Sequence, residues 1–284
     1  MYIFRIFLLL VLSTAILIHP AIAENDEGDP KEDLKTKIVD INFGLEKRHT
    51  AKTNVNGLML NLPSGYAENV NGLIVGPWIC RTESMNALCF GGLVEPWDHD
   101  GSSGIIFSLI TFTADFTGVS VSGGDYTGRF AGFSPSLLFN AFRGEFKGVS
   151  ICSVLSWCEK KASGVILTGG FNVVDEMRGV SLSGIYNHNI KAKGICGSLI
   201  WNGYERGQGF AFGGLVNSDS TYPKGEGYWK GASFAGIANL ADEHSGVQLG
   251  LFNRSKKIKG LQIGLINCAE NGILPVMPLI NFSF

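Results

Sequence analysis

The chain has 284 residues, a formal net charge of −2, 45% hydrophobic residues and only 17% charged residues. This nearly neutral balance offers no broad basic surface, so we expect no nucleic-acid partner. The 38 glycines are nearly twice the usual share. Apolar residues alternate with small or polar ones instead of recurring at helical spacing, which predicts an all-β protein with many short strands.

Residues 1–23 have the features of a secretory signal peptide. Arg5 precedes an apolar run over residues 6–18, and the small residues that follow fit cleavage after Ala23. An uncleaved membrane anchor is the alternative, although the run is short for a membrane span. Residues 24–37 hold six acids and three lysines and predict an acidic, disordered leader.

The remaining residues, 38–284, repeat a short phrase that begins with glycine and often ends with asparagine. The copies are degenerate over residues 38–117 and regular over residues 118–284, and two clean ones are Gly246–Asn253 and Gly260–Asn267. The glycines that start the regular copies are 14, 16, 16, 15, 15, 15, 22, 15 and 14 residues apart. A near-constant period is the signature of a repeat architecture, so we expect a single β-repeat domain.

Within each copy, the first and third residues after the glycine are large and apolar, as in Val180 and Leu182, while the residue between them is small or polar, as in Ser181. This alternation predicts a half-buried strand. An asparagine follows seven or eight residues after the glycine and is expected to turn the chain. The repeat is defined most clearly by these positions: Gly179, Asn187, Gly194, Asn202, Gly246, Asn253, Gly260 and Asn267.

Two architectures can use this unit of about 15 residues. In a parallel β-solenoid each copy forms about one coil, and equivalent glycines and asparagines stack in columns. In an antiparallel outer-membrane-type barrel each copy forms one of about 16 short strands, a reading that the alternating Ile280, Phe282 and Phe284 favour. Connectors of nearly constant length and short apolar stretches favour the solenoid. We expect the solenoid and keep the barrel as the alternative.

The sequence contains no recognisable catalytic constellation. The densest ligand-like cluster is Asp98–Asp100, with His99 at its centre, but three adjacent residues of an extended chain cannot all face one ion. The acidic pairs Asp175–Glu176 and Asp242–Glu243 fit either calcium ligands or solvated connectors. We therefore expect no enzymatic activity, no cofactor and no metal.

Six cysteines lie in the part of the chain after the expected signal peptide. Proximity favours the pairs Cys80–Cys89 and Cys152–Cys158. Small buried thiols are an equal alternative for Cys152, Cys196 and Cys268.

The best candidate for an interaction site is the long connector Ser218–Lys230, because insertions in repeat arrays form loops on one face. Aromatic residues that follow nearby strand ends could join it in a platform for a glycan or a protein. The alternative is that these rings cover coil edges or lie at a lipid interface. The candidate residues are Tyr186, Trp201, Tyr222, Lys224, Tyr228 and Trp229.

The tandem phrase G-[VL]-Q-[LI]-G-L-x-N in Gly246–Asn253 and Gly260–Asn267, followed by Leu274–Phe282 with its two prolines, resembles a known family. It is similar to bacterial surface-repeat proteins described from spirochaetes and found in other Gram-negative lineages. The match is sharp over residues 231–284 and fair over 118–230, where serine replaces the glutamine. The resemblance implies an exported, envelope-associated protein, and it brings no reaction and no catalytic residue.

Together these observations predict an exported, non-enzymatic repeat protein that acts as a rigid β scaffold for a protein or glycan partner. The outer membrane or the cell surface is the expected location, with the periplasm as the alternative. An integral outer-membrane barrel, such as a pore, is the main alternative function. An exported hydrolase rests only on scattered acids and histidines. The oligomeric state is left open.

Overall fold

The computed structural model describes residues 35–44, 53–96, 101–219 and 227–284. These ranges belong to one compact unit, Leu34–Phe284. The expected signal peptide and most of the expected leader lie outside them. The first strand begins at Lys35, three residues before the expected start of the repeat domain. All regular secondary structure of the described residues is β-strand, as the composition predicts.

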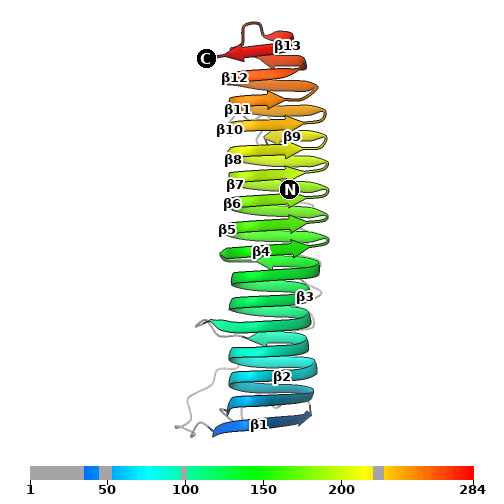
Figure 1. Cartoon of the computed structure of the whole chain (residues 1–284), viewed down its shortest axis with the longest axis vertical. Coiled ribbons are helices and arrows are strands. Elements are labelled where there is room, and N and C mark those ends of the chain that lie inside the picture. The colour runs from blue at the N-terminus through cyan, green and yellow to red at the C-terminus, as the bar shows by residue number, and fades with distance from the viewer. Residues whose placement is uncertain (1–34, 45–52, 97–100, 220–226) are drawn as a thin grey trace, which may run out of the picture. The chain divides into compact units, whose positions relative to one another are not determined.

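Thirteen strands follow one another along the chain and stack in nearly that order (Figure 1). The two longest, β2 and β3, each pass through several coils without a break. The strands are β1 (Lys35–Gly44), β2 (Thr53–Pro96), β3 (Ser102–Phe142), β4 (Phe146–Cys152), β5 (Leu155–Thr168), β6 (Phe171–Ser183), β7 (Tyr186–Ser198), β8 (Trp201–Gly213), β9 (Val216–Asp219), β10 (Tyr228–Ala235), β11 (Ala238–Leu249), β12 (Phe252–Ala269) and β13 (Val276–Ser283).

Neighbouring coils pair in parallel and in the register of the repeat. Gly179 lies beside Gly194, and Asn187 lies beside Asn202. The same alignment joins Gly246 to Gly260 and Asn239 to Asn253. The expectation of a parallel β-solenoid is therefore confirmed. The antiparallel barrel is wrong for the described residues, because only the β12–β13 pair runs antiparallel there.

A column of glycines forms one corner of the coil and explains why the phrase begins with this residue. Each has a positive φ between 121° and 148°. A Cβ atom at any of them would lie 1.9–2.4 Å from a carbonyl oxygen of the coil before. Glycine alone combines this backbone conformation with so close an approach. One coil departs from the pattern, since Ala87 pairs with Gly104 in the column.

A ladder of asparagine side chains runs along the inside of the coils, as the repeat predicts. Each side-chain amide donates to the side-chain oxygen of the next asparagine at 2.8–3.2 Å. All of these residues are fully buried. Before the ladder, Ser156 occupies the column between Asn140 and Asn172. The members of the ladder are Asn172, Asn187, Asn202, Asn217, Asn239, Asn253 and Asn267.

A second column faces this ladder from the residue two positions after the glycine, and it is polar in several coils. The Ser181 hydroxyl donates to the side-chain oxygen of Asn187 at 2.7 Å. Later in the chain, the Gln262 side-chain amide donates to the side-chain oxygen of Gln248 at 2.8 Å. Serine and glutamine therefore fill the same buried position, which explains how one replaces the other along the repeat.

The apolar part of the interior comes mostly from residues two positions before the glycines. Met177 and Ile258 are buried there. The rings of Phe142 and Phe146 stack with centroids 4.5 Å apart. Apolar packing thus shares the core with the polar columns.

The final strand, β13, covers the end of the stack. It pairs antiparallel with β12 and carries the alternating Ile280 and Phe282 that the sequence singled out. Pro278 lies within it and cannot donate a backbone hydrogen bond to a further strand. Proline on an exposed edge strand is a common protection against edge-to-edge association.

Candidate functional site

The large apolar residues of the repeat point out of the coil, and the small or polar residues point in. Cys196 is fully buried, while Ile195 beside it is 44% exposed. In the next coil Ala211 is fully buried and Phe210 is 56% exposed. A serine or glutamine at the inward position bonds to its polar neighbours, while in other coils a buried aliphatic side chain, such as Ile166, fills the same position. The strand is half-buried, as expected, and its outer side is apolar.

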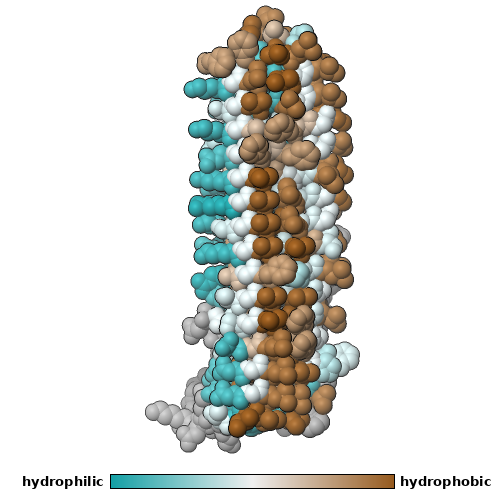
Figure 2. All heavy atoms as spheres, in the orientation of Figure 1, coloured by the Kyte–Doolittle hydropathy of each residue, from teal (hydrophilic) through white to brown (hydrophobic). Residues whose placement is uncertain are grey.

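These outward side chains form two columns, which we call the apolar face, and the second column is interrupted at the buried Gly197. In Figure 2 they are the brown rows beside a pale row. The first column, directly after the glycine position, consists of Leu58, Leu73, Leu88, Ile105, Val119, Phe133, Val149, Val165, Val180, Ile195, Phe210, Ala232, Val247 and Leu261. The second column, two residues further on, consists of Leu60, Val75, Phe90, Phe107, Val121, Pro135, Ile151, Leu167, Leu182, Gly197, Phe212, Phe234, Leu249 and Ile263.

The bend that follows the second column extends the apolar surface. Leu199 is 67% exposed there, and Leu265 is 61% exposed. From the first column to the bend is about 17 Å at the usual rise per residue, and the stack of coils is roughly 60 Å long at the usual strand spacing. The product is on the order of 1,000 Å², well above the 300–600 Å² of the largest patch on a typical monomer. A patch of this size indicates a binding surface.

Across the glycine column lies a charged surface, which we call the basic rim. It consists of the residues one and three positions before each glycine from Glu145 to Lys259, and Figure 2 shows it as the teal row. Its acids are Glu145, Glu176 and Glu243. Its nine basic residues are Lys147, Lys161, Arg178, Lys191, Lys193, Arg206, Lys230, Lys257 and Lys259. The rim is therefore strongly positive on a chain whose net charge is negative.

Each acid of the rim lies beside a basic residue of the same rim. Arg178 contacts Glu176 at 2.6 Å, and Lys257 contacts Glu243 at 3.1 Å. The Arg178 hydrogen bond lowers the pKa of the Glu176 carboxyl. Such exposed pairs contribute little to stability. Their effect is to neutralise the few acids and leave an excess of positive charge.

Two of the six candidate interaction residues lie together on the surface. The rings of Tyr186 and Trp201 meet edge to face with centroids 6.1 Å apart. The Trp201 indole donates to the Ser218 hydroxyl at 2.6 Å, and Trp201 is 49% exposed. They lie just past the apolar bend, on the opposite side of the apolar face from the basic rim.

The other candidates do not join this pair. Trp229 is fully buried, with its ring 4.7 Å from that of Tyr204, so a surface role for it is wrong. The indole enters the core because glycine stands at the equivalent place in the coil before: a Cβ on Gly207 would lie 2.3 Å from it. Tyr228 is exposed among the basic rim. Tyr222 and Lys224 lie outside the described residues.

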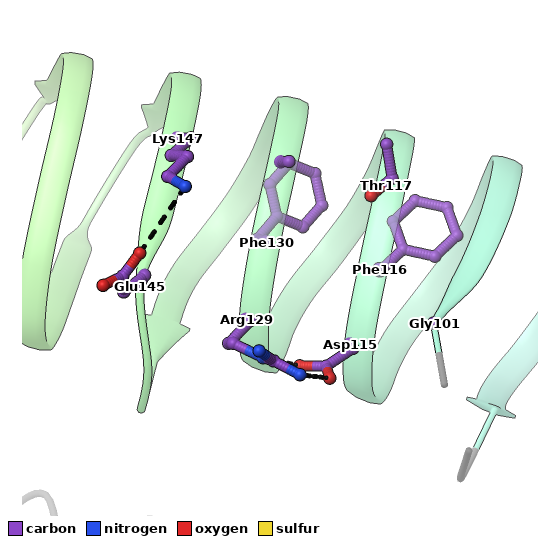
Figure 3. Close-up of a pocket in the computed structure, with 9 residues that line it drawn as sticks. Gly101, Asp115, Phe116, Thr117, Arg129, Phe130, Glu145 and Lys147 are labelled. Atoms are coloured by element: carbon purple, nitrogen blue, oxygen red, sulfur yellow. Dashed lines mark hydrogen bonds and ion pairs between the residues drawn. The ribbon is translucent and has the colours of Figure 1, made fainter. Parts of the chain in front are cut away.

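A shallow depression of about 270 Å³ lies at the N-terminal end of the charged surface and extends to the preceding coils (Figure 3). Arg129 makes a two-pronged ion pair with Asp115 at its floor, and Lys147 contacts Glu145 at 3.6 Å. Its lining contains no histidine, cysteine or serine. The lining charges satisfy one another, so the depression does not present a catalytic set.

Three of the four acids in the pairs that could hold calcium contact lysine or arginine. Asp242 contacts Lys256 at 2.8 Å, while the neighbouring glutamates belong to the ion pairs of the rim. Among the residues that the structure describes, no group of three histidines, cysteines or acids could hold a metal ion. The cluster Asp98–Asp100 lies outside the described residues, in the gap between residues 96 and 101.

The six cysteines are free thiols. Cys80 and Cys89 lie in hydrogen-bond contact, and this contact lowers the pKa of the Cys80 thiol. Cys152 instead donates to the backbone carbonyl oxygens of Leu138 and Leu155 at 3.2 and 3.1 Å. The expected disulfide between Cys152 and Cys158 is therefore absent, and both thiols are buried in the core.

Two buried histidines give the fold a pH dependence. Burial lowers the pKa of His188 and of His244 to about 4, below the ordinary value of 6.5. Near and below pH 6.5 the unfolded chain therefore binds more protons than the folded chain. The free energy of unfolding is highest above pH 6.5 and falls as the pH is lowered from about 6.5 to about 4. Replacement of His244 by glutamine should remove about 2 kcal/mol of the loss between pH 7 and pH 5. Urea unfolding of both proteins at pH 7 and pH 5 tests this. An equal fall in the free energy of unfolding for the wild type and the variant would contradict it.

No family model, curated protein or solved structure matches the chain. The resemblance to surface-repeat proteins thus remains a prediction. No helix formed by the described residues is long and apolar enough to cross a membrane. The fold and the surface define the class: a parallel β-solenoid repeat protein with a polar ladder inside and a continuous apolar face outside.

Proposed function

We propose that the protein is an exported, non-enzymatic repeat protein of the cell envelope, whose solenoid is a rigid scaffold for interaction. The observation that carries this proposal is the apolar face, which continues through every coil from Leu58 to Ile263. An apolar surface of this size and regularity is unfavourable in water unless a partner covers it. The repeat supplies the same side-chain type to each coil, so the partner is an extended one.

The interior supports the scaffold part of the proposal. The asparagine ladder and the glycine column bond and pack each coil against the next along the stack. In such arrays stability comes from contacts between neighbouring repeats. A binding face on this framework keeps its spacing without a partner, which lowers the entropic cost of association.

Export rests on the signal-peptide pattern of residues 1–23. The outer membrane or the cell surface is the proposed location, with the periplasm as the alternative. An apolar face fits an apolar partner better than a glycan, whose hydroxyl groups need hydrogen-bond partners. The pair of the half-buried Tyr186 and the exposed Trp201 is the part of the molecule that would suit a glycan.

Fractionation and protease treatment of intact cells test the location. We expect the chain in the envelope fraction, shortened by the signal peptide, and digested by added protease before lysis. Protection until the outer membrane is broken would place it in the periplasm. Recovery from the cytoplasm with residues 1–23 still attached would contradict the proposal. A variant with two arginines in the apolar run, Leu9→Arg and Leu10→Arg, is the control that should stay inside.

A further inference from the structure

We propose that the apolar face and the basic rim together bind the surface of an anionic lipid bilayer, with the solenoid lying flat on it. This inference rests on the proposed location in the cell envelope and names the partner. An element that combines an apolar surface with adjacent lysines and arginines inserts into the boundary between headgroups and acyl chains.

The two surfaces are placed for such an arrangement. Only the glycine column separates Lys193 from Ile195, and the same holds for Lys259 and Leu261 four coils later. The rim and the face therefore run side by side along the stack, as the teal and brown rows of Figure 2 show. A flat contact by the face brings the rim to the level of the lipid headgroups.

The charge of the rim selects an anionic surface. Nine basic residues and three acids occupy it, although the whole chain has a net charge of −2. The nearby acids Asp175, Glu205 and Asp242 lie one residue further from the apolar face than the rim does. Each lysine or arginine near an anionic bilayer contributes about 1 kcal/mol to binding.

The far edge of the apolar face has residues typical of a membrane interface. Trp201 is 49% exposed there and contacts Tyr186 of the previous coil. Tryptophan and tyrosine are enriched where headgroups meet the hydrocarbon. Between the two edges, the exposed rings of Phe210 and Phe212 supply apolar area that water would leave on insertion.

A second copy of the chain fits this surface less well. Face-to-face pairing would cover the apolar columns, but it would also require anionic groups opposite the rim. Past the bend, the positions seven to nine residues after each glycine hold no acid in any coil from Gly148 to Gly260. A copy of this chain therefore has no acidic column to offer, whereas an anionic bilayer has one charge on many of its headgroups.

Co-sedimentation of the full chain with vesicles of phosphatidylglycerol or of phosphatidylcholine tests the inference. We expect partitioning onto the anionic vesicles that weakens with salt. The variant Lys193→Glu/Lys230→Glu should partition roughly 30-fold less or weaker still. The variant Phe210→Ser/Phe212→Ser should lose at least about tenfold. All variants keep residues 1–34, so differences between them report the solenoid.

The matched control is Lys160→Glu/Arg254→Glu, which reverses two exposed charges outside the rim. It should change partitioning less than the rim variant does, because both charges lie further from the apolar columns than Lys193 and Lys230 do. Equal binding by the rim variant and the control would overturn the inference. So would absence of binding at low salt, or a soluble dimer that Phe210→Ser/Phe212→Ser dissociates. Vesicle binding is measured on purified chain, so its failure is separate from a failure of export.

Discussion

Replacement of Gly194 by alanine is expected to lower the free energy of unfolding by at least about 4 kcal/mol. Gly194 has φ near +129°, and a Cβ atom there would lie 2.1 Å from the carbonyl oxygen of Gly179. That oxygen belongs to the backbone of a paired strand, so neither coil can move aside without breaking ladder hydrogen bonds. Urea unfolding followed by circular dichroism measures the loss.

Gly101 provides the matched control for the steric part of this effect. It also has a positive φ, +97°, but nothing lies within 4 Å of the Cβ that alanine would add. The variant Gly101→Ala should therefore cost only the backbone strain, about 1–2 kcal/mol. Similar losses for the two variants would show that conformation alone, and not close packing of coils, selects glycine in the column.

The period and the architecture could be predicted from the sequence because each coil repeats the same steric demand. A corner that favours glycine recurs in nearly every coil, and the asparagine of the ladder recurs in every coil from Asn172 to Asn267. Gly194 and Asn202 therefore lie directly beside Gly209 and Asn217 in space, as their spacing of 15 residues indicates. Local alternation then separates inward from outward side chains.

The orientation of that alternation could not be predicted from the pattern alone. Apolar residues usually face the core, yet Val180 and Leu182 face outward and Ser181 faces inward. The contact between Ser181 and Asn187, six residues further along the chain, decides the orientation, because the buried amide of Asn187 needs polar partners. Once the asparagine ladder is known to be inside, the neighbouring serine column must be inside too.

The burial of Trp229 had a signal that single-residue reasoning misses. The tryptophan stands two positions before Gly231, where other coils have core residues such as Met177 and Ile258. Glycine occupies this position in the preceding coil, at Gly207, and leaves the space that the indole fills. The basic residues of the rim likewise recur with the repeat, one and three positions before the glycines. Both features follow only after the copies are aligned by their glycines.

Replacement of Asn202 by leucine tests whether the ladder carries the stability of the stack. The two side chains are similar in size, so the change removes hydrogen bonds and leaves no large cavity. Asn202 accepts from Asn187 at 2.9 Å and donates to Asn217 at 3.0 Å, all within the core. The variant leaves one donor and one acceptor without these partners, and we expect a loss of about 3 kcal/mol in the free energy of unfolding.

Asn71 is the control, because it makes the same type of bond in water. Its side-chain amide donates to the side-chain oxygen of Asn56 at 3.0 Å, on the exposed surface of the coil. The variant Asn71→Leu should change stability by less than about 0.5 kcal/mol, since water replaces the lost partner. Equal losses at the two sites in urea unfolding would mean that burial adds nothing to the bond. A loss confined to Asn202 would establish the ladder as the element that fixes the register of the coils, and hence the spacing of the apolar face.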